Sequence, residues 1–179
     1  MKVKIEKVAV LGAGVMGSQI AAHLSNAGIP SLLFDMTQAM AERGLKNALE
    51  LKPSPFYNPK TANLITPCNY DEHLDKIGEA DWIIEAIAER LDFKRALFEL
   101  IEPHLTPNAV VSSNTSGLSI KDMTATLSES FKRRFLVTHF FNPPRYMKLL
   151  ELVRGENTDD DVYETIGDFA ADVLGKGIV

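Results

Sequence analysis

Residues 8–17 read VAVLGAGVMG, an apolar run that ends in the glycine spacing Gly12-x-Gly14-x-x-Gly17. The apolar half is typical of a buried strand, and helical periodicity follows from Met16 to Asn26. In a strand–turn–helix of this kind, Gly12 permits the tight turn, Gly14 lets the backbone approach a pyrophosphate, and Gly17 lets the helix pack on the strand. Free amides at the helix start favour phosphate binding. We therefore predict a dinucleotide site, against the alternative of a plain strand–turn–helix.

Asp35 is the residue that we expect to select the cofactor. It closes the second predicted strand, Ser31–Phe34, at roughly 20 residues beyond the glycines, where dinucleotide-binding folds place a ribose-binding carboxylate. Such a carboxylate accepts hydrogen bonds from the adenosine ribose and repels a 2′-phosphate, and residues 36–38 offer no arginine. We predict NAD rather than NADP, with Val15 and Met16 contacting it at the helix start. The alternative is that Asp35 caps the next helix.

The rest of the chain alternates short apolar runs with longer helical patterns, which is typical of parallel βαβ units. After a first strand at residues 5–11, we predict further strands at 64–65, 82–86, 109–112, 135–140 and 149–153. We predict helices at residues 39–51, with Thr37 as the N-cap, and at 71–79, 93–101 and 160–174. Residues 53–60 should be irregular, because prolines recur there. Residues 1–179 should form one NAD-binding domain: a Rossmann-type, doubly wound, mostly parallel α/β sheet with helices on both faces. Another strand begins at Ile178, so we expect a longer protein.

The composition is that of an ordinary globular domain: 179 residues, 45% hydrophobic and 24% charged, with a net charge of −5. Basic residues are scattered among acids, and the cluster Lys132–Arg134 is interpreted as a solvated helix end, so we expect no nucleic-acid partner. No apolar run has the length of a membrane span, and residues 1–10 carry too much charge for a signal peptide. The single cysteine, Cys68, is expected to be inert, with no disulfide and no metal site. We predict a cytoplasmic protein.

His139 and Glu151 are the candidate catalytic pair. His139 follows an apolar strand, so it lies at the carboxyl end of the sheet, where ligands bind. Its imidazole is suited to take the proton of an alcohol whose hydride leaves for a nicotinamide. Glu151 lies among leucines on the next strand, where a carboxylate is costly unless it is paired. If the two strands are neighbours, Glu151 can orient the imidazole. The alternatives are a structural histidine and a solvent-facing or edge-strand glutamate.

Three later segments resemble the 3-hydroxyacyl-CoA dehydrogenases of fatty-acid β-oxidation. They are Ser113–Ser116, His139–Pro143 and Met147–Glu151, and with the glycine loop and Ile84–Ala86 they cover the chain almost end to end. The resemblance implies NAD-dependent oxidation of a (3S)-3-hydroxyacyl-CoA to a 3-oxoacyl-CoA. It assigns His139 as the base and Glu151 as the group that orients it.

The same resemblance implies roles for three further residues, and a fourth, Asn142, is assigned from its place in the chain. The Ser116 hydroxyl touches the 3-oxygen of the substrate, although residues 113–116 taken alone are equally typical of a turn. Glu89 and Lys94 approach the nicotinamide ribose and the coenzyme A side of the site, against the alternative of an exposed pair on a helix surface. Asn142 shapes the turn after His139 and is also a candidate substrate contact.

The chain departs from the family pattern in one region. Many relatives have a longer helical hairpin after the second strand, whereas Lys52–Pro67 is short and broken by prolines, so coenzyme A contacts are not transferred there. With this short insert, Asn142–Lys148 looks most like the multifunctional form, in which an enoyl-CoA hydratase-like part follows. The resemblance also implies a C-terminal helical domain that forms a homodimer and completes the substrate pocket. Without it, we expect the chain to bind NAD but to turn over poorly.

Two other functions fit the same residues. One is an NAD-dependent dehydrogenase of a small hydroxy acid or sugar acid, which would share the glycines, Asp35 and His139. The other is a non-catalytic NAD-sensing module, which the presence of Ser116, His139 and Glu151 together argues against.

Overall fold

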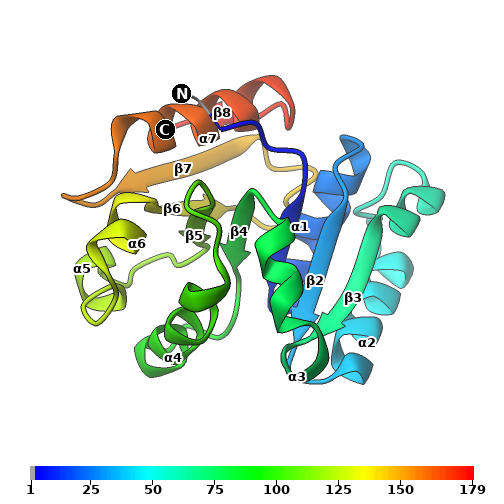
Figure 1. The fold of residues 1–179 in the computed structure, drawn as a ribbon. Helices are drawn as coiled ribbons and strands as arrows, with labels where there is room; N and C mark the ends of the chain where they lie inside the picture. Colours follow the sequence, from blue (N-terminus) through cyan, green and yellow to red (C-terminus); the bar gives the residue numbers. More distant parts are fainter. Residues whose placement is uncertain (1–2) are drawn as a thin grey trace.

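The computed structural model describes residues 3–179, so Met1 and Lys2 of the predicted domain lie outside it. Within that range one sheet carries eight strands in the order β3-β2-β1-β4-β5-β6-β7-β8 (Figure 1). The strands are β1 Val8–Leu11, β2 Ser31–Asp35, β3 Ile65–Asn69, β4 Trp82–Glu85, β5 Val110–Ser113, β6 Phe135–Phe140, β7 Leu149–Arg154 and β8 Gly177–Ile178. Strands β1 to β6 are parallel, β7 is antiparallel to β6, and β8 is parallel to β7. This confirms the predicted mostly parallel sheet.

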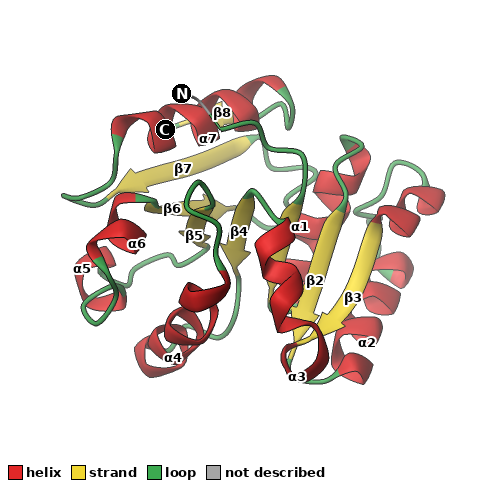
Figure 2. Ribbon diagram, viewed as in Figure 1, coloured by secondary structure: helices red, strands yellow, loops and turns green. Residues whose placement is uncertain are grey.

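Helices cover both faces of the sheet (Figure 2). They are α1 Val15–Asn26, α2 Gln38–Glu50, α3 Tyr70–His73, α4 Leu91–Ile101, α5 Ile120–Met123, α6 Glu129–Arg133 and α7 Asp160–Asp172, with 3-10 turns at Pro59–Leu64, Leu74–Glu79 and Glu102–His104. One face packs against α1, α2 and α7, and the other packs against α4, α5 and α6. The two-sided burial explains why the parallel strands read as continuous apolar runs.

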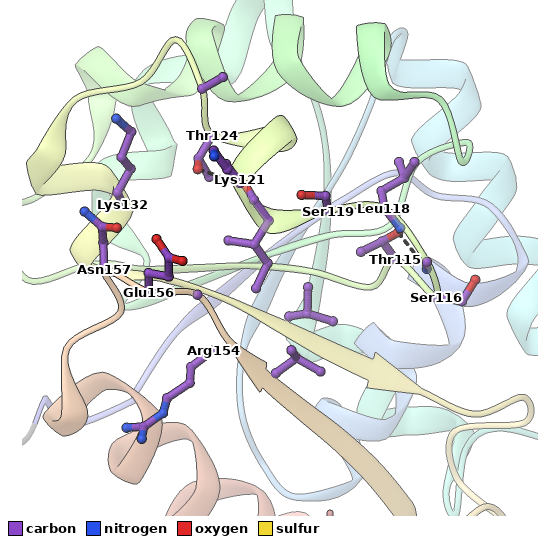
Figure 3. Close-up of a pocket in the computed structure, with 16 residues that line it drawn as sticks. Thr115, Ser116, Leu118, Ser119, Lys121, Thr124, Lys132, Arg154, Glu156 and Asn157 are labelled. Carbon is purple, nitrogen blue, oxygen red and sulfur yellow. Dashed lines mark hydrogen bonds between the residues drawn. The ribbon is translucent and has the colours of Figure 1, made fainter.

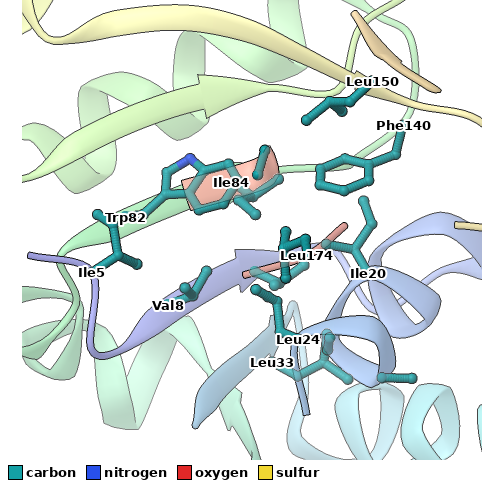
Figure 4. Packing of buried hydrophobic residues seen from close by; sticks show 14 of the residues in the cluster. Ile5, Val8, Ile20, Leu24, Leu33, Trp82, Ile84, Phe140, Leu150 and Leu174 are labelled. Atoms are coloured by element: carbon teal, nitrogen blue, oxygen red, sulfur yellow. The ribbon is translucent and has the colours of Figure 1, made fainter. Parts of the chain in front are cut away.

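Side chains alternate between two apolar clusters along each strand. On β6, Leu136 and Phe140 enter the cluster beneath α1 and α7, together with Trp82 of β4 (Figure 4). Phe135 and Val137 enter the cluster beneath α4 to α6. His139 is two residues beyond Val137, so it lies on the α4–α6 face, where β6 reaches the edge of that helical layer.

Apart from the helix predicted at residues 71–79, the predicted strands and helices are confirmed in kind, and several bounds change. The first strand begins at Val8 rather than at Ile5, because its neighbours begin to pair there, at Ser31 and Trp82. The third strand is longer than predicted. It contains Pro67, which a strand tolerates at the sheet edge because no further strand needs its missing N–H.

Two short helices were missed in whole or in part: α5 was not predicted, and α6 was predicted only at its end, where Lys132–Arg134 was interpreted as a helix end. Each is stabilised at its start by a serine: the Ser119 hydroxyl accepts the N–H of Asp122, and the Ser128 hydroxyl accepts that of Phe131. The predicted helix at 71–79 is instead one α-turn followed by a 3-10 segment that contains Gly78, a residue that disfavours helix.

One local prediction, the N-cap of the second helix, is confirmed. Thr37 is the N-cap of α2, where its side chain accepts the N–H of Met40. Cys68 is buried, its thiol donates to the carbonyl of Thr66, and burial raises the pKa of the thiol. None of the helices in the described chain combines the length and apolarity that crossing a bilayer requires.

Candidate active site

The His139–Glu151 pair is formed by the one antiparallel contact of β6. His139 lies directly opposite Glu151 in the β6–β7 register, and Nδ1 is 2.8 Å from Oε2. Because an ionised carboxylate only accepts hydrogen bonds, Nδ1 carries the proton and Nε2 is left as the acceptor. The side chains are 21% and 45% exposed, so the pair is accessible from solvent. The condition set by the sequence, that the two strands are neighbours, is met.

The surroundings of His139 hold its ring and backbone in place. The Phe141 ring lies 4.8 Å from the imidazole, centroid to centroid. The Asn114 side chain accepts the N–H of Phe140 at 2.8 Å, so the loop after β5 is tied to the end of β6. Asn114 therefore links residues 113–116, the serine loop, to the strand that carries His139.

The loop after β5 is organised by carboxylates from β4 and from the start of α4. The Ser113 hydroxyl donates to Glu85 Oε2 at 2.5 Å, and the Thr115 hydroxyl donates to Glu89. The backbone N–H of Ser116 also donates to Glu89, at 3.2 Å, and the Ser116 side chain is exposed. Residues 113–115 thus form the bonded turn, and Ser116 is the one that presents its side chain outward.

Glu89 and Lys94 belong to a partly buried charge network. Lys94 is 1% exposed and Glu85 is fully buried, and Lys94 Nζ lies 2.6 Å from Glu85 and 3.5 Å from Glu89. The backbone N–H of Ile87 completes the coordination of Glu85 at 2.7 Å. The alternative of an exposed helix-surface pair is therefore wrong for Lys94.

The charge of Glu89 is favoured by its partners. Partial burial acts to raise the pKa of this carboxyl, but hydrogen bonds from Thr115 and Ser116 and the nearby Lys94 ammonium outweigh it and hold the pKa below its usual value. Glu89 is thus a fixed anion beside the serine loop.

Glu85 is the site residue that the sequence reasoning missed. It ends the fully buried strand Trp82–Glu85, and a carboxylate in that position requires partners. The same argument led to Glu151, and applied here it would have predicted a partner for Glu85 as well. What it could not predict is that the partner is Lys94, nine residues further along the chain.

The glycine loop has the geometry that a bound pyrophosphate requires. Gly12 has φ +106°, and a Cβ there would lie 2.8 Å from the Ala86 carbonyl oxygen. A Cβ at Gly17 would lie 1.7 Å from the Gly12 carbonyl oxygen, so only glycine allows α1 to pack this closely. A Cβ at Gly14 would meet nothing within 4 Å, so the surface above it is open to a ligand. No acidic residue occupies the first turn of α1, which leaves its positive end available to an anion.

Asp35 lies beside this loop at the end of β2. Its Oδ2 accepts the N–H of Ala13 at 2.8 Å, and Oδ1 accepts the N–H of Met36 at 2.7 Å. The helix-cap alternative is wrong, because Thr37 caps α2. Val15 and Met36 are both about two-thirds exposed, at 66% and 67%. The Asp35 carboxylate thus contacts the glycine loop directly, through Ala13.

The turn that joins β6 to β7 is held by contacts with α1 and with residues 54–57. The Asn142 side chain accepts from Gln19 of α1 at 3.3 Å, which ties the turn to the cofactor helix. Arg145 stacks on the Tyr57 ring at 4.0 Å and donates to the carbonyls of Ser54 and Phe56. The proline-broken region therefore packs against this turn.

A pocket of about 710 Å³ opens next to Ser116. Figure 3 shows Ser116 and Thr115 at one end, with Lys121, Arg154 and Asn157 toward the other. Its walls include Val137 and Val153, which oppose each other one step along the same sheet face as His139 and Glu151. The pocket is thus continuous with the face that carries the pair. No cluster of metal-binding side chains occurs in residues 3–179.

Comparison with known proteins identifies relatives of this domain. A family model described as "3-hydroxyacyl-CoA dehydrogenase, NAD binding domain" matches residues 7–179. Proteins named as 3-hydroxyacyl-CoA dehydrogenases in Bacillus subtilis and Deinococcus radiodurans are each 44% identical over 98% of this chain, which spans 25% and 53% of their lengths. A Rickettsia prowazekii protein named as a fatty acid oxidation complex trifunctional enzyme is 40% identical over the whole chain, which spans 26% of it.

Solved structures agree with these relatives. The crystal structure of Mycobacterium tuberculosis FadB2 superposes with a TM-score of 0.85 at 31% identity, over 99% of this chain and 64% of that one. The 3-hydroxybutyryl-CoA dehydrogenase of Escherichia coli K12 gives a TM-score of 0.86 at 29% identity, over 99% of this chain and 38% of that one. Fold, glycine loop and sequence match all lead to one assignment: the chain belongs to the NAD-binding domain family of the 3-hydroxyacyl-CoA dehydrogenases, a family of NAD-dependent oxidoreductases.

Proposed function

We propose that the protein carrying this chain oxidises (3S)-3-hydroxyacyl-CoA to 3-oxoacyl-CoA with NAD in fatty-acid oxidation, and that this chain supplies the cofactor site and the catalytic base. The observation that carries the proposal is the His139–Glu151 contact of 2.8 Å at the carboxyl edge of the sheet, one strand away from the serine loop. The names of the relatives support the substrate class.

The residues of this chain divide the work of holding NAD. Backbone amides of the Gly12–Gly17 loop and the start of α1, with Val15 and Met16, would hold the pyrophosphate. Asp35 would accept hydrogen bonds from the adenosine ribose. Glu89 and Lys94 would meet the nicotinamide ribose, with Glu85 fixing Lys94 from below. When bound, NAD⁺ accepts the hydride that leaves the alcohol carbon.

Proton removal is the task of the β6–β7 pair. His139 Nε2 takes the proton of the 3-hydroxyl, because Nδ1 already donates to Glu151. The Glu151 carboxylate holds the ring and stabilises the imidazolium that forms. The Ser116 hydroxyl would hydrogen-bond the 3-oxygen and polarise it. Asn142 would hold the turn next to His139 and, from that place, could contact the substrate.

We further propose that the whole protein is larger than this chain. The chain spans a quarter to about half of its first curated relatives, and one of them is named as a trifunctional enzyme. A C-terminal helical part would complete the substrate pocket and form a homodimer, so residues 1–179 alone should bind NAD but turn over slowly. The free, buried Cys68 suits a reducing cytoplasm. The acidic net charge of −5 supports a small-molecule substrate rather than nucleic acid.

The test compares substrates with the full-length protein. We expect NADH to be oxidised rapidly with acetoacetyl-CoA and far more slowly with acetoacetate, which has the same reacting carbons without coenzyme A. Activity on acetoacetate or another small oxo acid, with none on the thioester, would instead favour the hydroxy-acid alternative. NAD binding without turnover of either substrate class would favour a sensing module.

A further inference from the structure

A buried lysine outside the catalytic pair stands between α7 and β8. Lys176 is 6% exposed, and its ammonium donates to the carbonyl of Pro144 and, at 2.8 Å, to the carbonyl of Met147. The Phe140 ring lies 5.8 Å from Nζ, within cation–π range. Within the described residues these partners include no carboxylate.

The electrostatic surroundings make this position unfavourable for a charge. Burial and, after it, the positive charge of Lys176 lower the pKa of His23, and Arg145 acts on His23 in the same direction, so several groups that carry or can carry positive charge lie near one another here. Burial lowers the pKa of Lys176 to about 8. Burying an ammonium without a counter-ion opposes folding, so packing alone does not explain a lysine here.

The groups that Lys176 holds are informative. Pro144 and Met147 lie in the loop 141–148, which joins the strand of His139 to the strand of Glu151. The backbone reinforces the same attachment, because the N–H of Gly177 donates to the carbonyl of Lys148 at 2.8 Å and β8 pairs with the first residues of β7. The chain after α7 is thus fastened to the loop between the two catalytic strands (Figure 1).

We propose that Lys176 is a positioning residue, which holds the loop 141–148 so that His139 and Glu151 stay aligned for proton transfer. Its action passes through the carbonyls of Pro144 and Met147, and it touches neither substrate nor cofactor. The inference rests on the proposed function, since it concerns the alignment of the same catalytic pair.

If Lys176 positions the loop, its replacement should lower activity without lowering stability, whereas a purely structural role would not separate the two effects. Replacing a buried lysine that has no acidic partner by methionine of similar length removes the desolvation penalty of the ammonium, which offsets the cost of leaving the two carbonyls without their donor, so stability should change little. The loop carbonyls lose their donor at the same time, so the alignment of the pair should suffer. A lysine that merely packs would lower both properties or neither.

The experiment uses the full-length protein with Lys176→Met, Lys176→Arg and, as matched control, Lys148→Met, which removes an exposed lysine from the same loop. We expect Lys176→Met to lower kcat with acetoacetyl-CoA by at least about 10-fold, since misalignment of a base is costly. KM and the Kd for NADH should be unchanged, and the melting temperature should stay near or above its original value. Lys176→Arg keeps charged donors and should recover part of kcat, and Lys148→Met should behave like the unchanged protein.

Two results would overturn the inference. One is an unchanged kcat in Lys176→Met. The other is a loss of kcat that follows a fall in melting temperature in both Lys176 variants. Failure of the proposed function is visible separately, because the unchanged protein would then be inactive on acetoacetyl-CoA or insensitive to His139→Gln.

Discussion

At the scale of single residues, the site depends on charges whose environment fixes their state. Glu151 is half-exposed and paired with one imidazole, whereas Glu85 is fully buried and shared among Lys94, Ser113 and a backbone N–H. The first arrangement leaves a base open to substrate. The second supports the serine loop from below, and its contribution to the free energy of unfolding can be measured separately from catalysis.

Breaking the buried pair should destabilise the fold. Lys94→Met leaves the Glu85 carboxylate buried without its cation, and we expect the free energy of unfolding to fall by about 3–5 kcal/mol in urea titrations. Lys46→Met is the control, because Lys46 and Glu50 form an exposed pair at 4.0 Å and its loss should cost under about 1 kcal/mol. Equal, small losses for the two variants would contradict the assigned support role.

His23 should make stability fall in mild acid. Burial, and secondly the positive charge of Lys176, lower the pKa of this histidine from 6.5 to about 4. Below pH 6.5 His23 binds a proton in the unfolded chain, whereas in the folded chain it binds one only near pH 4. The free energy of unfolding should therefore decrease across that window, by up to about 3 kcal/mol at 1.36 kcal/mol per pKa unit.

The measurement for His23 is urea unfolding at several pH values between 7 and 4, for the unchanged protein and His23→Gln. Glutamine does not titrate, so the variant should have a flatter pH dependence than the unchanged protein. An identical slope for both proteins would assign the acid sensitivity to other groups.

At the scale of elements, the strand–turn–helix that begins at Val8 has two glycines with opposite tasks. Gly17→Ala would place a Cβ 1.7 Å from the Gly12 carbonyl oxygen, so it should destabilise the fold. Gly14→Ala meets no protein atom within 4 Å, so it should leave the melting temperature unchanged. Because the space above Gly14 is where the pyrophosphate would lie, Gly14→Ala should raise the Kd for NADH by about 10-fold or more, equivalent to 1.4 kcal/mol. Calorimetric titration and thermal melts separate the two effects, and an unaltered Kd would contradict the placement.

Most elements could be predicted because their signals are local. Apolar runs located β2, β4, β5 and β6, and Thr37 located the start of α2. Strand ends such as Val8 could not be located, because pairing partners far along the chain set them. Helices of four or five residues such as α5 are too short to show a helical period.

A site residue could be predicted where burying its charge would cost free energy, because such a residue needs a partner. It could not be predicted where the contact is created only by tertiary structure. The position of Glu151 among leucines predicted that it has a partner, and the β6–β7 register places His139 opposite it. Lys176 lies between two glycines near the end of the chain, in a pattern that resembles any loop. Its contact with Pro144 spans 32 residues and arises only when β8 joins β7.

At the scale of the whole molecule, the strand order brings the candidate groups together at the carboxyl ends of the parallel strands. The order reverses between β1 and β4, and in doubly wound sheets ligands bind at the carboxyl ends of strands beside such a reversal. The glycine loop follows β1, Glu85 ends β4, the serine loop follows β5, and His139 lies near the end of β6. The proposed cofactor site, polarising serine and base thus follow one another from the reversal toward the antiparallel β6–β7 hairpin.

The most direct measurement is single-turnover oxidation of NADH by acetoacetyl-CoA in the full-length protein, with His139→Gln and Glu151→Gln beside it. We expect hydride transfer to slow by at least about 10²-fold in His139→Gln, and to slow less in Glu151→Gln, while NADH still binds with its original affinity. Rapid hydride transfer in His139→Gln at saturating substrate would contradict the assignment of the base, and with it the proposed mechanism.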